Sequence, residues 1–230
     1  MWEEILTICR QQDSFRAITQ IEATHLPLFV AKSYSQLVQD FYYRAKDVPL
    51  MLMIGRAGVQ YALHEARRHS SSDPALAREL RGLAKTMSYN LAVNCWPGWN
   101  EPGIMITPAD LEHGHDLARL NLHLAHELQL PPDKVAGAYW LLGAQQMAAK
   151  ETCAAFDSFQ QAAQLYEQAN LAESRHMASG YAGIAQMQAA ETRAAGEQQL
   201  ASATTALDSF TSDDAKFFSQ QLACVREVFV

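Results

Sequence analysis

Two ten-residue stretches, forty residues apart, determine how this 230-residue chain folds. Residues 146–155 read QMAAKETCAA and residues 186–195 read QMQAAETRAA, and seven of the ten aligned positions are identical. The same shift superimposes three further pairs of small residues: Ala138 and Ala178, Gly143 and Gly183, Ala163 and Ala203. Self-similarity at a fixed period of this size indicates an internal repeat.

The chain around the repeat has the composition of closely packed helices. Residues 136–206 contain twenty-one alanines and ten glutamines among 71 positions, and small alanine side chains let helices approach closely. No segment shows the alternation of β-branched residues that is typical of strands. Glycine and proline number 11 and 8 in the whole chain, fewer than average usage. The sequence therefore predicts an all-α protein.

Proline residues mark where the helices begin. Proline is tolerated in the first turn of a helix, and Asp73-Pro74 and Thr107-Pro108 combine it with a capping residue. We expect about nine or ten helices in a single domain, 1–230, with a soft internal boundary at 95–107 between residues 1–95 and 108–230. Five helices are predicted individually: 28–46, 50–69, 74–94, 108–129 and 133–150.

The first copy of the repeat has a recognisable residue pattern. Its two predicted helices carry an aromatic, a leucine and a glycine, then an alanine, a phenylalanine and an alanine: Tyr139, Leu142, Gly143, Ala155, Phe159 and Ala162. With these residues the segment 137–168 resembles the tetratricopeptide repeat family, and 177–211 resembles it more weakly through Ala182, Gly183 and Ala195. Gln146 and Glu167 depart from the family pattern. The resemblance implies antiparallel helix pairs stacked as an irregular α-solenoid.

The resemblance also implies a binding face, because the first helix of each tetratricopeptide pair lines a concave groove. By spacing from Gly143 and Gly183, that face consists of Gly137, Trp140, Ala144, Met147, Ala148, Met177, Gly180, Ile184, Met187 and Gln188. Tryptophan and methionine suit an apolar or amphipathic peptide. The alternative is that these residues are buried by adjoining helices or by a second copy of the chain.

The N-terminal half contains a fainter version of the pattern. Ile54, Ala57, Gly58 and Tyr61 match the spacing of a first helix, with 74–94 as its partner. If first and second helices alternate strictly from 50–69 onward, 108–129 is a first helix and 133–150 is a second helix. The clearer copy downstream instead requires 133–150 to be a first helix. Either the irregular segment 96–103 breaks the phase, or the N-terminal match is accidental.

That irregular segment, WPGWNEPG at 96–103, is a rigid loop with two aromatic side chains. Trp96 and Trp99 either plug the ends of neighbouring helices, or line a pocket or contact a partner. Both are kept as candidate partner-binding residues.

Charge and cysteine usage limit the possible partners and the compartment. The formal net charge of −7 argues against a general nucleic-acid binder. Eight basic residues against four acids between Arg44 and Lys85 suggest either a patch for an anionic partner or solvated helix faces. Four dispersed cysteines indicate a reducing, cytoplasmic location. The longest apolar run, 50–54, is too short to cross a membrane.

Motifs for catalysis are lacking, because the sequence contains no GxSxG, P-loop, GxGxxG or HExxH pattern. Two Glu-x-x-His pairs, ending at His25 and His115, have the spacing used by di-iron bundles. His113, His123, His126 and Glu65 are further candidate ligands for such a metal site. We expect structural histidines, and hence no cofactor and no metal.

These observations favour a non-enzymatic helical-repeat protein that binds another protein, a peptide or a second copy of itself. On this basis, changing Trp140 and Met147 to alanine is expected to weaken partner binding and leave helical content intact. The alternative functions are a helical-bundle enzyme or metal- or ligand-binding protein with a pocket near Trp96, Trp99 and His113–His126, and a module that senses a small ligand.

Overall fold

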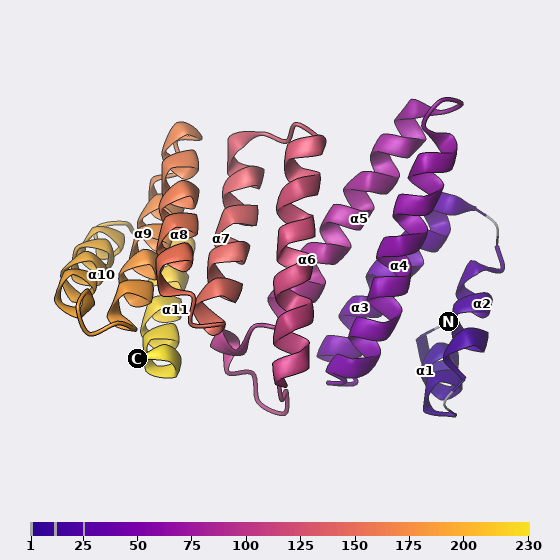
Figure 1. Cartoon of the computed structure of the whole chain (residues 1–230), viewed down its shortest axis with the longest axis horizontal. Helices are drawn as coiled ribbons and strands as arrows, with labels where there is room; N and C mark the ends of the chain where they lie inside the picture. Colours follow the sequence, from indigo (N-terminus) through magenta and orange to yellow (C-terminus); the bar gives the residue numbers. More distant parts are fainter. Residues whose placement is uncertain (1, 12, 25) are drawn as a thin grey trace.

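The computed structural model describes residues 2–11, 13–24 and 26–230 and contains, in these ranges, eleven α-helices, one short 3-10 helix and no strand. From α1 to α10 the helices run broadly in chain order along the long axis of the molecule, whereas α11 folds back beneath α8 and α9 (Figure 1). Each helix packs against the next in the chain. Their bounds are α1 Trp2–Arg10, α2 Ser14–Glu22, α3 Pro27–Tyr43, α4 Val48–His69, α5 Pro74–Asn94, η1 Pro97–Trp99, α6 Pro108–Glu127, α7 Pro132–Ala148, α8 Thr152–Gln168, α9 Ala172–Met187, α10 Arg193–Asp208 and α11 Asp213–Phe229. The predicted all-α class is confirmed.

The helix starts are fixed by local capping. Asp47 and Asp73 each accept a hydrogen bond from the backbone N–H three residues later, at 3.0 Å. At the start of α6, Thr107 and Asp110 bond each other's backbone N–H groups in a capping box. Each cap satisfies donors that the first turn of a helix leaves unpaired. The five individually predicted helices are all present, with ends that differ by a few residues.

The forty-residue repeat coincides with two helix pairs. The helices α7 and α9 begin at residues 132 and 172, and α8 and α10 begin at residues 152 and 193. In the first pair, Gly143 of α7 lies against Phe159 of α8, so that a Cβ atom built on Gly143 would be 2.9 Å from the phenylalanine ring. In the second pair, Gly183 of α9 lies against the backbone of Gly196 and Leu200 in α10. Small residues therefore allow close approach in both pairs, as the sequence pattern predicts.

The N-terminal half packs differently from the sequence-based expectation. Gly58 of α4 lies against Tyr34 of the preceding helix, α3, whereas in the α7–α8 pair the corresponding glycine faces the following helix. The helix α3 also contacts α5, and α5 contacts α7. The spacing match at 54–61 therefore does not reproduce the packing of the downstream repeat. The expected count of nine or ten helices is also too low, because residues 2–22 contribute two short helices, α1 and α2.

A single hydrophobic cluster joins the two halves of the chain. It includes Phe41 and Leu91 from the N-terminal half and Trp140 and Leu222 from the C-terminal half. Trp96, in the segment expected to form a soft boundary, lies inside this cluster with only 1% of its surface exposed. The first part of the irregular segment thus belongs to the core, whereas residues 100–103 are exposed.

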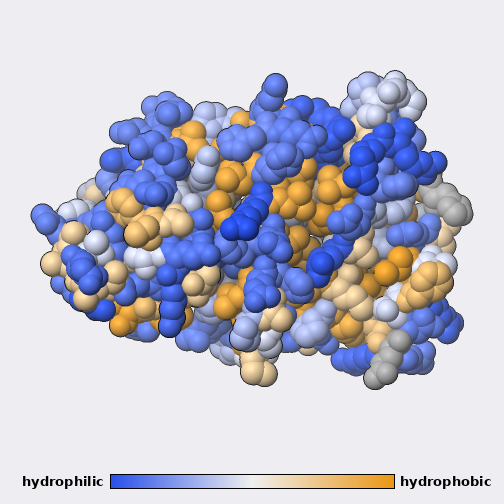
Figure 2. Space-filling model, viewed as in Figure 1, coloured by the Kyte–Doolittle hydropathy of each residue, from blue (hydrophilic) through white to orange (hydrophobic). Residues whose placement is uncertain are grey.

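The surface in Figure 2 is largely hydrophilic, with apolar side chains gathered in the middle of the view, over the region of α5, α6 and α7. Within the described residues, no helix combines the length and the apolar character that a membrane span requires.

Candidate partner-binding site

The structure brings the predicted face together but does not leave it open. Trp140 is 5% exposed and Trp99 is half-buried. The other predicted partner-binding residues are buried as well: Trp96, Ala144, Met147, Met177, Ile184 and Met187. Only Met187 borders a wide groove, the one between α10 and α11. The expectation that the predicted side chains line an empty groove along α7 and α9 is therefore wrong. The alternative, burial by adjoining helices, describes what the structure shows.

The C-terminal helix α11 covers the predicted face on α9. Its inward side is an apolar stripe at spacings of three and four: Ala215, Phe218, Leu222, Val225 and Phe229. Leu222 lies on Gly180, where a built Cβ atom would be 2.5 Å from Leu222 Cδ1. Although α11 begins 41 residues after the start of α9, as a third repeat would, it folds back to contact α9 and η1 (Figure 1).

Beneath the end of α11 lies a cluster of aromatic rings drawn from four elements. The ring of Trp96 stacks on Phe229 at a centroid distance of 5.8 Å and an interplanar angle of 20°. It also meets Trp99, Trp140 and Tyr181 at 5.1, 5.9 and 6.0 Å. Such pairs add stabilisation beyond the area they bury. Both tryptophans of the loop therefore plug the space between helices, as one of the two predicted interpretations has it.

Three polar atoms of this cluster are buried without a hydrogen-bond partner in the described part of the chain: Trp96 Nε1, Trp140 Nε1 and Tyr181 Oη. Burial also raises the pKa of Tyr181 well above its ordinary value, so its hydroxyl keeps its proton. An unpaired buried donor is costly, on the order of 1–3 kcal/mol. While α11 covers the cluster, these three groups therefore donate no hydrogen bond within the described residues. Trp99 differs, because its Nε1 donates to the Val93 carbonyl at 2.8 Å.

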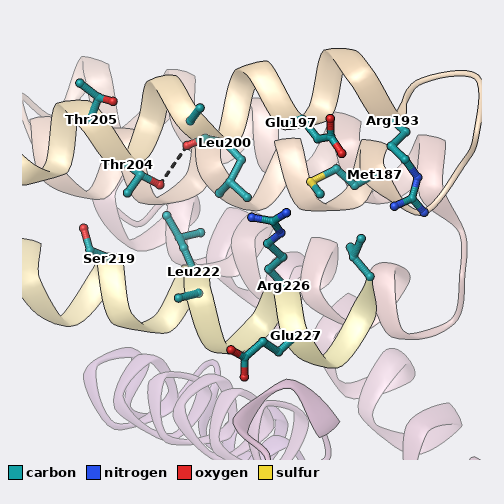
Figure 3. A pocket seen from close by; sticks show the side chains of 13 residues that line it. Met187, Arg193, Glu197, Leu200, Thr204, Thr205, Ser219, Leu222, Arg226 and Glu227 are labelled. Atoms are coloured by element: carbon teal, nitrogen blue, oxygen red, sulfur yellow. Dashed lines mark hydrogen bonds between the residues drawn. The ribbon is translucent and has the colours of Figure 1, made fainter.

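A wide groove remains between α10 and α11, with a volume of about 1030 Å³. Its floor includes Leu200 and Leu222, and Met187 of α9 also lines it. Figure 3 shows Arg226 extending from α11 toward α10, while Arg193 lies near the start of α10. Neither arginine forms a salt bridge within the described residues. Two carboxylates, Glu197 and Glu227, line the same groove, so its charged groups are of both signs. An apolar floor of this kind suits an amphipathic segment.

Sequence reasoning missed the role of α11. The segment 213–229 lacks the glycine and tyrosine that mark the repeat, so no motif drew attention to it. The signal that was available is the helical spacing of its five apolar stripe residues. Periodicity shows that a helix has one apolar side, but it does not show which surface that side covers.

The space beside the tryptophans is small. It measures about 160 Å³ and is lined by Tyr42, Trp99, Glu101 and Ile104 among others. Ligand pockets for small molecules are usually about 300–1,000 Å³. This geometry gives little support to the alternative of a ligand pocket near Trp96 and Trp99.

The candidate metal ligands do not converge. His113 contacts Arg56 Nη1 at 3.3 Å, His126 packs against the ring of Tyr139, and His123 lies 3.9 Å from Glu127. His25 lies outside the described residues. Among the residues that the structure describes, no three His, Cys, Asp or Glu side chains form a group able to hold a metal ion.

We expect His115 to make the stability of the fold depend on pH. Burial, and then the positive charge of Arg119, lower its pKa below the ordinary value, while Glu151 and Asp116 oppose this shift. As the pH falls, His115 therefore takes up a proton at a higher pH in the unfolded chain than in the folded chain. Stability is expected to be unaffected above the unfolded pKa of about 6.5 and to fall as pH drops below it.

Thermal unfolding of the unmodified chain and of His115→Gln, followed by circular dichroism from about pH 8 to about pH 5, measures this effect. As the pH falls, we expect the thermal stability of His115→Gln to decrease less than that of the unmodified chain. The control is His123→Gln, because His123 is exposed. Identical acid profiles for the unmodified chain and His115→Gln would assign the loss to other groups.

Compared with models of known protein families, with curated proteins and with solved structures, the chain matches none.

Proposed function

We propose that this protein is a non-enzymatic, tetratricopeptide-like helical-repeat module that binds an amphipathic helix of another protein on the face of α7, α9 and η1. The observation that carries the proposal is α11 itself, since an amphipathic helix with Leu222 and Phe229 on its apolar side already lies there. Amphipathic helices bind grooves of this kind through apolar residues spaced by three and four positions.

In this proposal α11 competes with the partner for one surface. A partner must therefore bind the face more strongly than the tethered helix does, and weakening α11 raises the partner's apparent affinity. The unpaired donors of Trp96, Trp140 and Tyr181 add a polar contribution that α11 leaves unused. The connection between α10 and α11 spans only residues 209–212.

A second copy of the chain is an alternative partner, because its own α11 has the required pattern. Nucleic acid does not suit a chain of net charge −7. The four cysteines are unpaired, with Cys9 and Cys95 buried, which supports the proposal of a cytoplasmic location.

The test uses a fluorescein-labelled peptide of residues 213–230 and the full-length chain. In the variant Leu222→Ala/Phe229→Ala the tethered helix holds the face more weakly, so the free peptide should bind about tenfold more tightly than to the unmodified chain. Fluorescence anisotropy measures the binding, and tryptophan emission reports on the cluster around Trp96 and Trp140.

Two controls make the test specific. The variant Phe217→Ala removes a phenylalanine that is 54% exposed on the same helix, and it should bind the peptide no better than the unmodified chain. A peptide with serine at the positions of Leu222, Val225 and Phe229 should not bind. Equal binding of both peptides, or no binding to the double variant, would contradict the proposed function.

A further inference from the structure

A second groove, separate from α11, runs along α5 beside the turn between α6 and α7. Its volume is about 640 Å³. One wall is a stripe of α5 that includes Arg78, Gly82 and Lys85, and the other wall includes Leu130 and Lys134. The α5 residues that line it, 75–86, extend for about 17 Å at the usual rise of a helix. This length corresponds to three helical turns.

Gly82 is the unusual residue of this groove. A Cβ atom built on it would meet nothing within 4 Å, whereas each of the other glycines inside the described helices faces a neighbour within that distance. Glycine in the middle of a helix is unfavourable relative to alanine, and no packing inside this chain accounts for it here. A bare backbone at this point allows another helix to approach α5 closely.

The groove is also a positive region on an acidic protein. Arg78, Lys85 and Lys134 line it, and its one carboxylate, Glu79, pairs with Lys32 at 3.5 Å. Arg78 donates to the Leu128 carbonyl at 2.7 Å, and Lys134 lies 3.1 Å from Asp133.

Lys85 is the cation that most lacks a counter-charge. It is half-buried, lies 5.3 Å from the centre of the Tyr89 ring and forms no salt bridge within the described residues. Burial and the nearby charge of Lys134 lower its pKa. A negative group placed between Lys85 and Lys134 would relieve both effects.

We infer that this groove is a docking site for an acidic amphipathic helix of a partner protein, which crosses α5 at Gly82, sets apolar residues on Leu83 and Leu130, and places carboxylates beside Lys85 and Lys134. The three-turn length and the apolar walls favour a helix over an extended acidic chain. This site shares no residue with the face beneath α11, so either proposal stands without the other.

The probe is a fluorescein-labelled helical peptide of about 18 residues, with leucines at spacings of three and four and glutamates at most other positions. Its binding to the full-length chain is measured by fluorescence anisotropy at low and high salt. We expect saturable binding that is about tenfold weaker in Lys85→Glu/Lys134→Glu and that weakens as salt is added. The variant Gly82→Leu should lose binding, because its side chain extends into the groove from a position where a Cβ atom meets nothing within 4 Å.

Three controls separate docking from unfolding and from general charge effects. Circular dichroism should show that Gly82→Leu has at least the helical content and thermal stability of the unmodified chain. The variant Lys216→Glu reverses a charge on α11, outside the groove, and should bind the probe normally. A probe with lysines in place of glutamates should not bind.

Several outcomes overturn the inference. One is that the acidic probe shows no saturable binding, or that it binds Gly82→Leu as well as it binds the unmodified chain. Another is that the lysine probe binds as well as the acidic one. The last is that the chain binds anionic phospholipid vesicles and not the acidic probe. The peptide of residues 213–230 should not displace the acidic probe. Displacement would show that the probe binds the face beneath α11, and would therefore contradict the inference that the groove along α5 is a separate site.

Discussion

Replacing Trp140 with alanine is expected to lower the free energy of unfolding by about 3–5 kcal/mol. The indole is 5% exposed and contacts Trp96 and Tyr181, at ring distances of 5.9 and 5.4 Å. Removal therefore leaves a cavity among the rings of Trp96, Trp99 and Tyr181. This expectation replaces the one drawn from sequence, in which the same substitution leaves the fold intact.

Urea unfolding followed by circular dichroism measures the loss, with Phe15→Ala as the control. Phe15 is also a large aromatic residue on a helix but is 80% exposed, so its removal should change stability by less than about 0.5 kcal/mol. A Trp140→Ala variant as stable as the unmodified chain would show that the aromatic cluster is loosely packed, and the burial of the predicted face would then have to be abandoned.

Replacing Gly183 with alanine is expected to lower the free energy of unfolding by about 1–3 kcal/mol, toward the upper end of the usual range for overpacking. A Cβ atom at this position would lie 2.8 Å from both the Gly196 carbonyl oxygen and the Leu200 backbone nitrogen. A side chain can rotate away from a new methyl group, but a backbone cannot. The helices α9 and α10 must therefore move apart along their contact.

The matched control is the same substitution at Gly82, where a new methyl group meets nothing within 4 Å. Alanine there is expected to raise stability by about 0.5–1 kcal/mol, through better helix propensity and a more restricted unfolded chain. The two glycine-to-alanine variants should thus change stability in opposite directions. Equal effects would mean that the close approach of α9 and α10 is not required for stability.

Much of the fold was predictable because its causes are local. Proline and a capping aspartate begin α4 and α5 wherever the rest of the chain lies. Two residues of the repeat pattern, Gly143 and Phe159, lie against each other in the first helix pair. The N-terminal spacing match did not indicate how its helix packs, because Gly58 has the right spacing for the repeat but faces Tyr34 of the preceding helix. Spacing along one helix does not specify which neighbouring helix it meets.

The candidate site was likewise predictable in part. Spacing placed Gly180 and Ile184 on the same side of α9 as Met177, and that side is the one that α11 covers. What occupies it was not predictable, because Leu222 lies about forty residues further along and its apolar stripe suits any apolar surface. The groove beside α5 escaped prediction for a related reason, since it lies between elements that are distant in sequence. The groove beside α11 lies between consecutive helices, and it was missed because the packing of α11 was not predictable.

By itself, the sequence determined that this chain is helical and where most of its helices begin. These properties depend on capping, helix propensity and residue periodicity, which act over a few neighbouring positions. Only the tertiary structure decided that α11 folds back onto α9 and the aromatic cluster, and that Gly82 remains uncovered. Those outcomes depend on which apolar surfaces meet, and that choice is made among all the helices at once.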